Sequence, residues 1–303
     1  MESETFTVIT GASQGLGKAV AEECAIRGRA LVLAALPDTG LVEVARWIER
    51  VHGVRVHALE VDLAADDGPA RLARFVEENG LAVDALVNNA GVGFNGRFGE
   101  SEPGHNETTI RLNMLAVVAL THRLLPALRR QSRAHVLNVA SLAAFFPMPW
   151  LPVYSSSKSF VFAFSLALRE ELRGTGVSVS VVCPNGIRTN RGARELIARQ
   201  GLAGRLTCQY PEQVARAALR GMLAGRAVIV PGRVNRFIRV ASGLVPRSVA
   251  MGVITRRWNA EALRTNGGAH TTGDRRRPTP KPAGWLAAWL AGWSPSRRAA
   301  ARV

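Results

Sequence analysis

Short apolar runs rich in β-branched residues alternate with longer helical patterns from residue 5 to about residue 230. The runs at 30–35 and 177–182 each lie between two helical patterns, which calls for right-handed βαβ crossovers within one parallel sheet. Such crossovers cover both faces of the sheet with helices. The alternation therefore predicts a doubly wound α/β domain of about seven strands, with ligands bound at the carboxyl ends of the strands.

The boundaries of the expected elements follow from the same alternation. The expected strands are 5–10, 30–35, 54–61, 83–88, 135–140, 177–183 and 227–231, and the expected helices are 15–28, 41–52, 67–79, 106–131, 154–173 and 211–224. We expect residues 1–232 to form the catalytic-type domain, 233–260 a basic helical appendage, and 261–303 a mostly disordered tail.

Charge separates these regions. The chain of 303 residues has a net charge of +16, and its segment 233–303 holds 14 basic and two acidic residues. The basic character therefore belongs to the tail and says nothing about the chemistry of the main domain. A hydrophobic fraction of 47% supports a sizeable core. Three scattered cysteines and an N-terminus without the pattern of a signal peptide favour a cytoplasmic protein.

A glycine-rich segment, ThrGlyAlaSerGlnGlyLeuGly at 10–17, lies between the first expected strand and the first helix. Its glycines allow a tight turn, close approach of the backbone to a pyrophosphate, and packing of the helix against the sheet, although an ordinary glycine turn is the alternative. The residues expected to surround a pyrophosphate are Gly11, Ser13, Gln14, Gly15, Leu16 and Gly17.

Tyr154 and Lys158 lie four residues apart on an expected helix, so that one face presents both. A nearby ammonium favours the ionised phenol, which lowers its pKa from about 10 and lets Tyr154 exchange a proton with a carbonyl or alcohol oxygen. Ser141, at the end of the fifth strand, would donate a hydrogen bond to the same oxygen. A lone pair of this spacing is more often a surface Tyr beside a solvated Lys, but only three of the 39 basic residues are Lys.

The glycine spacing, together with Ser141, Tyr154 and Lys158, resembles the classical short-chain dehydrogenase/reductase superfamily over residues 5–232. The resemblance implies a Rossmann-type fold and an NAD(P)-dependent enzyme that interconverts a hydrophobic ketone or aldehyde and its alcohol by hydride transfer. The finer pattern is similar to the bacterial 3-ketoacyl and hydroxysteroid reductase branch. A non-catalytic NAD(P)-binding sensor or scaffold is the alternative, and it would be expected to lack the Tyr or the Lys.

The same resemblance implies further site residues. Asn113 would hold a water of the proton relay, Asp62 would bind the adenine amino group, and the AsnAsnAlaGly turn at 88–91 would support the glycine loop. In the loop after the sixth strand, Asn185 replaces a usual glycine, and its tolerance of positive φ suggests that the loop shape is kept. The cofactor residues implied are Asp62, Leu63, Asn89, Ala90, Gly91, Tyr154, Lys158, Pro184, Asn185, Gly186, Ile187 and Thr189.

The sequence leaves the choice between NADP and NAD open. The end of the second strand, where an acidic residue or an Arg would discriminate the ribose, is apolar at Ala35 and Leu36. Asp38 could fold back onto the ribose or be a solvated turn residue. The branch resemblance favours NADP.

An apolar wall is expected around the substrate, although its side chains could instead pack as loop core. The predicted pocket residues are Phe94, Phe98, Phe145, Phe146, Met148 and Trp150. No metal site is predicted, because the six histidines show no paired spacing.

Partners are predicted from surface patterns. The apolar helices 106–131 and 154–173 favour a homodimer, although their faces could simply cover the sheet. The segment 234–258 is either a lid over the substrate pocket or a helix lying on an anionic membrane, and no specific nucleic-acid binding is expected.

Overall fold

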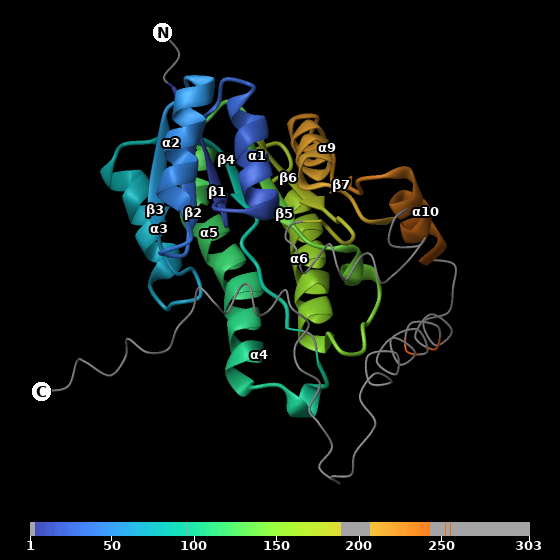
Figure 1. Cartoon of the computed structure of the whole chain (residues 1–303). Helices are drawn as coiled ribbons and strands as arrows, with labels where there is room; N and C mark the ends of the chain where they lie inside the picture. The colour runs from blue at the N-terminus through green and yellow to red at the C-terminus, as the bar shows by residue number, and fades with distance from the viewer. Residues whose placement is uncertain (1–3, 95, 189–206, 243–251, 253–254, 256–303) are drawn as a thin grey trace, which may run out of the picture.

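The computed structural model describes residues 4–94, 96–188, 207–242, 252 and 255. Seven parallel strands form one sheet in these ranges, in the order β3-β2-β1-β4-β5-β6-β7 (Figure 1). The strands are β1 (Thr5–Thr10), β2 (Ala30–Ala35), β3 (Val56–Glu60), β4 (Ala82–Asn88), β5 (Ala134–Val139), β6 (Val177–Val182) and β7 (Val228–Ile229). The predicted doubly wound parallel sheet is confirmed.

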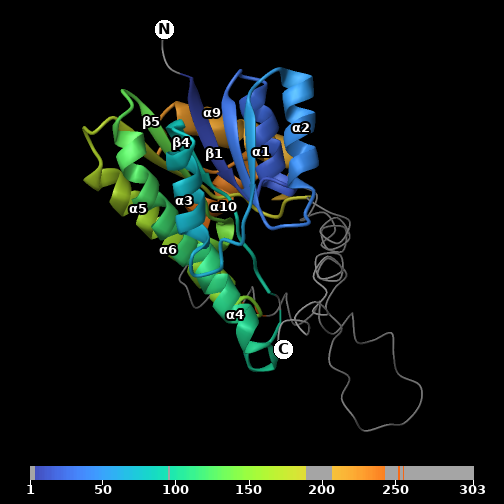
Figure 2. The same cartoon turned by 90° about the vertical axis from the view of Figure 1, so that its left-hand side faces the viewer.

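Helices cover both faces of this sheet. One layer contains α1, α2 and α9, and the other contains α3, α5 and α6 (Figure 2). Each layer buries a separate apolar core against the strands. The helices are α1 (Gly15–Ala25), α2 (Leu41–His52), α3 (Gly68–Glu78), α4 (Pro103–Ile110), α5 (Ala116–Arg129), α6 (Pro152–Glu171), α9 (Pro211–Leu223) and α10 (Arg233–Ser242), with short 3₁₀ turns η1 (Phe98–Glu100) and η3 (Leu142–Phe145).

Two sequence-based boundaries are wrong. The helix expected over 106–131 begins at Pro103 and is divided into α4 and α5 by a π-helical segment, η2 (Arg111–Leu115). Proline suits the first turn of a helix, where its missing N–H would have no partner, and the same rule explains why α6 begins at Pro152. The last strand is shorter than expected, because only Val228 and Ile229 pair with β6.

The strand order places β1 between β2 and β4, so the chain leaves β1 in one direction and later returns to its other side. At such a switch point the loops after the two strands diverge and leave a crevice at their carboxyl ends. The glycine loop after β1 and the AsnAsnAlaGly turn after β4 meet there.

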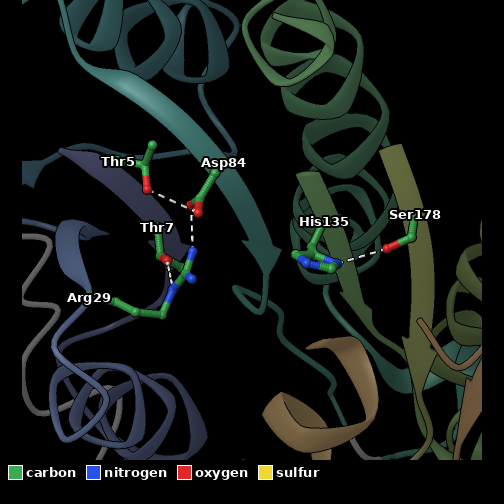
Figure 3. Close-up of polar contacts among 6 residues, drawn as sticks. All are labelled: Thr5, Thr7, Arg29, Asp84, His135 and Ser178. Carbon is green, nitrogen blue, oxygen red and sulfur yellow. Dashed lines mark hydrogen bonds and ion pairs between the residues drawn. The ribbon is translucent and has the colours of Figure 1, made fainter. Parts of the chain in front are cut away.

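Polar contacts hold the opposite, amino end of the sheet together (Figure 3). Arg29 forms an ion pair with Asp84 at 2.5 Å and donates to the Thr7 hydroxyl at 2.8 Å. On the neighbouring strands, His135 Nδ1 lies 2.8 Å from the Ser178 hydroxyl. These residues lie far from the carboxyl-end loops and are assigned to stability.

Candidate active site

The glycine loop uses backbone conformations that glycine adopts readily. Gly11 and Gly15 have φ values of 65° and 58°, in the region that favours glycine. A side chain at Gly17 would overlap the Gly11 carbonyl, so α1 starts directly against the loop. Ser13, Gln14 and Gly15 stay accessible, whereas Leu16 is buried. The start of α1 therefore offers free backbone N–H groups and a positive dipole end beside an open loop.

The turn after β4 braces this loop. Asn89 Nδ2 donates to the carbonyl oxygens of Thr10 (2.8 Å) and Gly11 (3.2 Å). In return, the Thr10 hydroxyl accepts from the backbone N–H groups of Asn89 (3.0 Å) and Ala90 (2.9 Å). Sequence reasoning overlooked Thr10, although its position directly before the glycine motif was a usable signal. Asn89 thus acts on the loop, and Gly91 remains exposed at the crevice.

Ser141, Tyr154 and Lys158 come together at the carboxyl end of β5. The Ser141 hydroxyl hydrogen-bonds the Tyr154 phenol and also accepts from the Ala143 N–H at 3.1 Å. Lys158 Nζ lies 5.8 Å from the centroid of the Tyr154 ring and donates to the Val139 carbonyl at 2.9 Å. A side chain at Gly93 would approach within 2.5 Å of the Tyr154 ring, which shows how closely the loop after β4 packs on it.

Burial dominates the electrostatics of this group. It raises the pKa of Tyr154 above its ordinary value, and the hydrogen bond with Ser141 opposes this effect only in part. Burial also lowers the pKa of Lys158 to about 8. The expected lowering of the Tyr154 pKa by the Lys158 ammonium is not found, and the phenol is protonated at neutral pH. Such a phenol can donate a proton to a carbonyl oxygen.

Asn113 lies in the π-helical segment and is completely buried. Its Oδ1 accepts from the Val92 N–H at 2.8 Å, and its Nδ2 donates to the Val92 carbonyl at 2.8 Å and to the Ser157 hydroxyl at 3.0 Å. The side chain thus holds the loop after β4 in place. Ser157, one residue before Lys158, was overlooked in the sequence and completes this link to α6.

The loop after β6 continues the crevice. Pro184 is buried and its carbonyl accepts from the Leu142 N–H at 2.9 Å, while Ile187 pairs with Gln209. Asn185 does not have the positive φ that we expected, and its Nδ2 donates to Asn235 of α10 at 3.4 Å. Gly186 is exposed, and Thr189 lies outside the described residues.

The adenine end of the crevice is more open. Asp62 is exposed and its Oδ1 accepts from the Ala64 N–H at 2.9 Å, whereas Leu63 is buried. Asp38, after β2, is exposed and has a φ of 59°. Its turn is closed by the Thr39 hydroxyl, which donates to the Leu36 carbonyl at 2.7 Å.

A cavity adjoins Tyr154 and unites part of the predicted apolar wall. Its lining residues are Phe94, Gly96, Phe98, Ser101, Asn106, Thr109, Pro152, Val153 and Tyr154. Phe145 instead packs edge-on against Phe162 of α6, with ring centroids 4.9 Å apart. Phe146, Met148 and Trp150 are half-buried in the loop that leads to α6 and do not line this cavity.

Comparisons with known proteins agree with this geometry. The family model of the short chain dehydrogenases matches residues 5–198. The ketoacyl reductase HetN of Nostoc is 30% identical over 71% of this chain and 74% of its own length. Rat estradiol 17-beta-dehydrogenase 11 is 32% identical over 84% of both chains. A short-chain dehydrogenase from Sphingobium yanoikuyae, solved with NADPH, has a TM-score of 0.67 at 26% identity and covers 91% of this chain and 100% of its own.

The chain belongs to the short-chain dehydrogenase family, and its relatives are of the ketoacyl and hydroxysteroid reductase kind. It is an NAD(P)-dependent oxidoreductase that acts on carbonyl or alcohol groups.

Proposed function

We propose that the chain reduces a hydrophobic ketone or aldehyde to the corresponding alcohol, with NADPH as the preferred donor. The observation that carries this proposal is the hydrogen-bonded pair of Ser141 and Tyr154 beside a cavity walled by Phe94 and Phe98. The aromatic rings of this wall can pack against the apolar part of a ketone, while Ser101, Asn106 and Thr109 add polar groups to the lining.

Each residue has a defined task in this reaction. A nicotinamide cofactor held by the glycine loop would supply the hydride for the carbonyl carbon. Tyr154 donates its proton to the carbonyl oxygen, so that the product is a neutral alcohol. Ser141 donates a hydrogen bond to that oxygen while its negative charge develops. We assign the glycine loop to the pyrophosphate, and Lys158 to the ribose hydroxyls and the orientation of Tyr154.

The preference for NADPH is supported by the relative from Sphingobium, which binds it, and by the lack of an acidic residue at the end of β2. To test it, NADPH and NADH are each titrated calorimetrically into the full chain, and a panel of cyclic and fused-ring ketones is then tried with the tighter ligand. We expect tighter binding of NADPH and turnover of an apolar ketone. Tight binding without turnover of any carbonyl would instead favour the sensor alternative.

We also propose a homodimer formed through α5 and α6. Leu115 is 56% exposed where α5 begins, and Phe160 and Phe164 stack at a ring distance of 6.0 Å on half-buried positions of α6. Light scattering at tens of micromolar should give the mass of two chains. Leu115→Glu should lower that mass, whereas Ile26→Glu, at a similarly exposed position after α1, should not. A monomeric wild-type protein would contradict the dimer.

We propose a peripheral contact with anionic membranes through α10. Val234, Phe237 and Val240 are 41%, 73% and 64% exposed and follow each other at helical spacing, beside the exposed Arg233 and Arg236. Among the described residues, no helix combines the length and the hydropathy that a membrane-spanning segment needs. An apolar stripe with a cationic rim suits a helix that lies in a membrane interface.

The segment α10 also packs on the main domain, as the lid alternative expects, although Thr207, Pro231 and Phe145, which it contacts, do not line the cavity beside Tyr154. Asn235 is buried and donates to the carbonyls of Thr207 (2.9 Å) and Pro231 (3.1 Å), and the Arg239 guanidinium lies 5.6 Å from the Phe145 ring. One face of α10 is therefore docked beside η3, while Val234, Phe237 and Val240 are exposed. The rest of the predicted segment 234–258 lies outside the described residues except for positions 252 and 255.

Co-sedimentation of the full chain with phosphatidylglycerol vesicles tests the membrane contact. Phe237→Ser should weaken binding several-fold, high salt should weaken it further, and Val51→Ser on α2, which removes a 53% exposed side chain elsewhere, should not. Equal binding by all three proteins would refute a role for α10.

We further propose a cytoplasmic location, which the free thiols of Cys24, Cys183 and Cys208 support.

A further inference from the structure

Trp150 has an unusual backbone conformation for its size. Its φ is 70°, and the other described residue besides glycine with a positive φ is Asp38, whose short polar side chain tolerates this region better. A bulky aromatic residue held there is strained. Because such strain persists only when the surroundings enforce it, the contacts of Trp150 show what it is used for.

Two contacts join Trp150 to the loop after β4. Its carbonyl oxygen accepts from the Gly96 N–H at 2.9 Å. Its ring lies under the Arg97 guanidinium, with 5.4 Å between the guanidinium carbon and the ring centroid. The turn that carries Trp150 is closed by the Leu151 N–H, which donates to the Met148 carbonyl at 3.2 Å. Backbone and side chain of one residue thus hold the same neighbouring loop.

The joined segments form two of the walls of the cavity beside Tyr154, and Asn106 and Thr109 of α4 complete its lining. Phe94, Gly96 and Phe98 line it from the loop after β4, and Pro152 and Val153 line it from the start of α6. Trp150 itself does not line the cavity, but it lies two residues before the wall formed by Pro152 and Val153 and contacts the wall formed by the loop after β4. Its position therefore sets how far apart the walls stand.

We propose that Trp150 is a specificity-determining residue that acts through Arg97 and Gly96. Its strained backbone turns the carbonyl to Gly96, and its ring fixes Arg97, so the Phe94–Phe98 wall is held against the opening beside Tyr154. A fixed wall that presents Phe94 and Phe98 favours bulky, rigid ketones, which reach these rings, over small ones, which do not. The substrate part of this inference rests on the proposed carbonyl reduction, whereas the contact between the loops does not.

Substitutions of Trp150 and of Arg97 test the contributions of the aromatic ring and of the cation separately. Trp150→Gly keeps the carbonyl and adopts the positive φ without strain, but removes the ring. Arg97→Gln removes the cation and Arg97→Lys restores it. Arg173→Gln is the matched control, because Arg173 pairs with Glu170 in the same exposed, three-residue spacing as Arg97 with Glu100 but lies on another part of the surface.

Two measurements on the full chain decide the proposal. Hydrogen exchange of the 92–100 segment, which needs no substrate, should be faster by about fivefold in Trp150→Gly and in Arg97→Gln but not in Arg97→Lys or Arg173→Gln. The ratio of kcat/KM for decalone to that for cyclohexanone should fall roughly tenfold in Trp150→Gly, mainly through KM for decalone, and less in Arg97→Gln.

Each outcome supports or overturns a different statement. Unchanged exchange in Trp150→Gly would show that the ring does not hold the loop and would overturn the proposal. Faster exchange with a ketone ratio within twofold of the wild-type value would support the contact between ring and loop but overturn the specificity role. A wild-type protein that binds NADPH but reduces no carbonyl would refute the proposed function, and the exchange result would still decide whether the ring holds the loop.

Discussion

Lys158 belongs to the candidate active site, and the burial of its ammonium lowers the stability of the fold. Its side chain is 5% exposed and donates to the Val139 carbonyl, and burial lowers its pKa from the ordinary 10.5 to about 8. Because the unfolded chain holds this proton more tightly than the folded chain, the ammonium destabilises the fold below pH 8. That penalty disappears as the pH rises from about 8 to about 10.5.

Lys158→Met should therefore stabilise the fold while it abolishes turnover. We expect the free energy of unfolding near pH 7 to rise by about 2 kcal/mol, since methionine fills a similar volume without a charge to desolvate. Urea denaturation of both proteins across this pH range measures the effect, and the two curves should converge toward pH 10.5. A variant less stable than the wild type at neutral pH would show that burial of this ammonium does not oppose folding.

At the scale of elements, the π-helical segment η2 matters because it aims Asn113 at the loop after β4. All three hydrogen bonds of this side chain go to Val92 and Ser157. Asn113→Ala would remove the side-chain partner of the Val92 N–H and carbonyl, whereas the Ser157 hydroxyl would keep its bond to the Tyr154 carbonyl, and we expect a cost of about 1–3 kcal/mol of stability. Chemical denaturation checks this. If stability is unchanged, Asn113 holds no structural contact that matters, and the relay water implied by the family resemblance becomes its better assignment.

The sequence predicts elements that depend on local residue patterns, and it does not predict those that depend on contacts between distant residues. Alternating apolar runs predicted all seven strands, and the residues after the strand ends predicted most of the crevice, because strand ends and parallel pairing bring those positions together. The π-helical segment was not predictable, since an extra residue in one turn leaves no local composition signal. The positive φ of Trp150 runs against its own preference and is enforced by Gly96 and Arg97, which lie more than fifty residues away in sequence.

At the scale of the whole molecule, the two ends of the sheet have different tasks. The carboxyl end carries the site, and the amino end carries the buried polar contacts of Figure 3. Among these, His135 is 5% exposed, and burial, assisted by Arg29, lowers its pKa. The unfolded chain therefore takes up a proton at this position before the folded chain does, and stability falls as the pH drops below about 6.5.

His135→Gln removes this proton uptake. We expect the free energy of unfolding to fall less steeply between about pH 7 and about pH 5 in the variant than in the wild type. Denaturation midpoints at the two pH values measure the difference. Parallel behaviour of the two proteins would mean that other groups control the acid sensitivity. Activity at neutral pH should be affected little, because His135 lies at the end of the sheet remote from Tyr154.

The central claim is that Tyr154 transfers the proton in carbonyl reduction, and Tyr154→Phe tests it most directly. The measurement compares kcat on an accepted ketone with the dissociation constant for NADPH, in the wild-type and variant proteins. We predict that kcat falls at least about 100-fold, because a positioned general acid typically contributes that much to the rate. The affinity for NADPH should change by less than about threefold, since the phenol is assigned to the substrate oxygen. A variant that turns over the ketone at a rate close to that of the wild type would contradict the account.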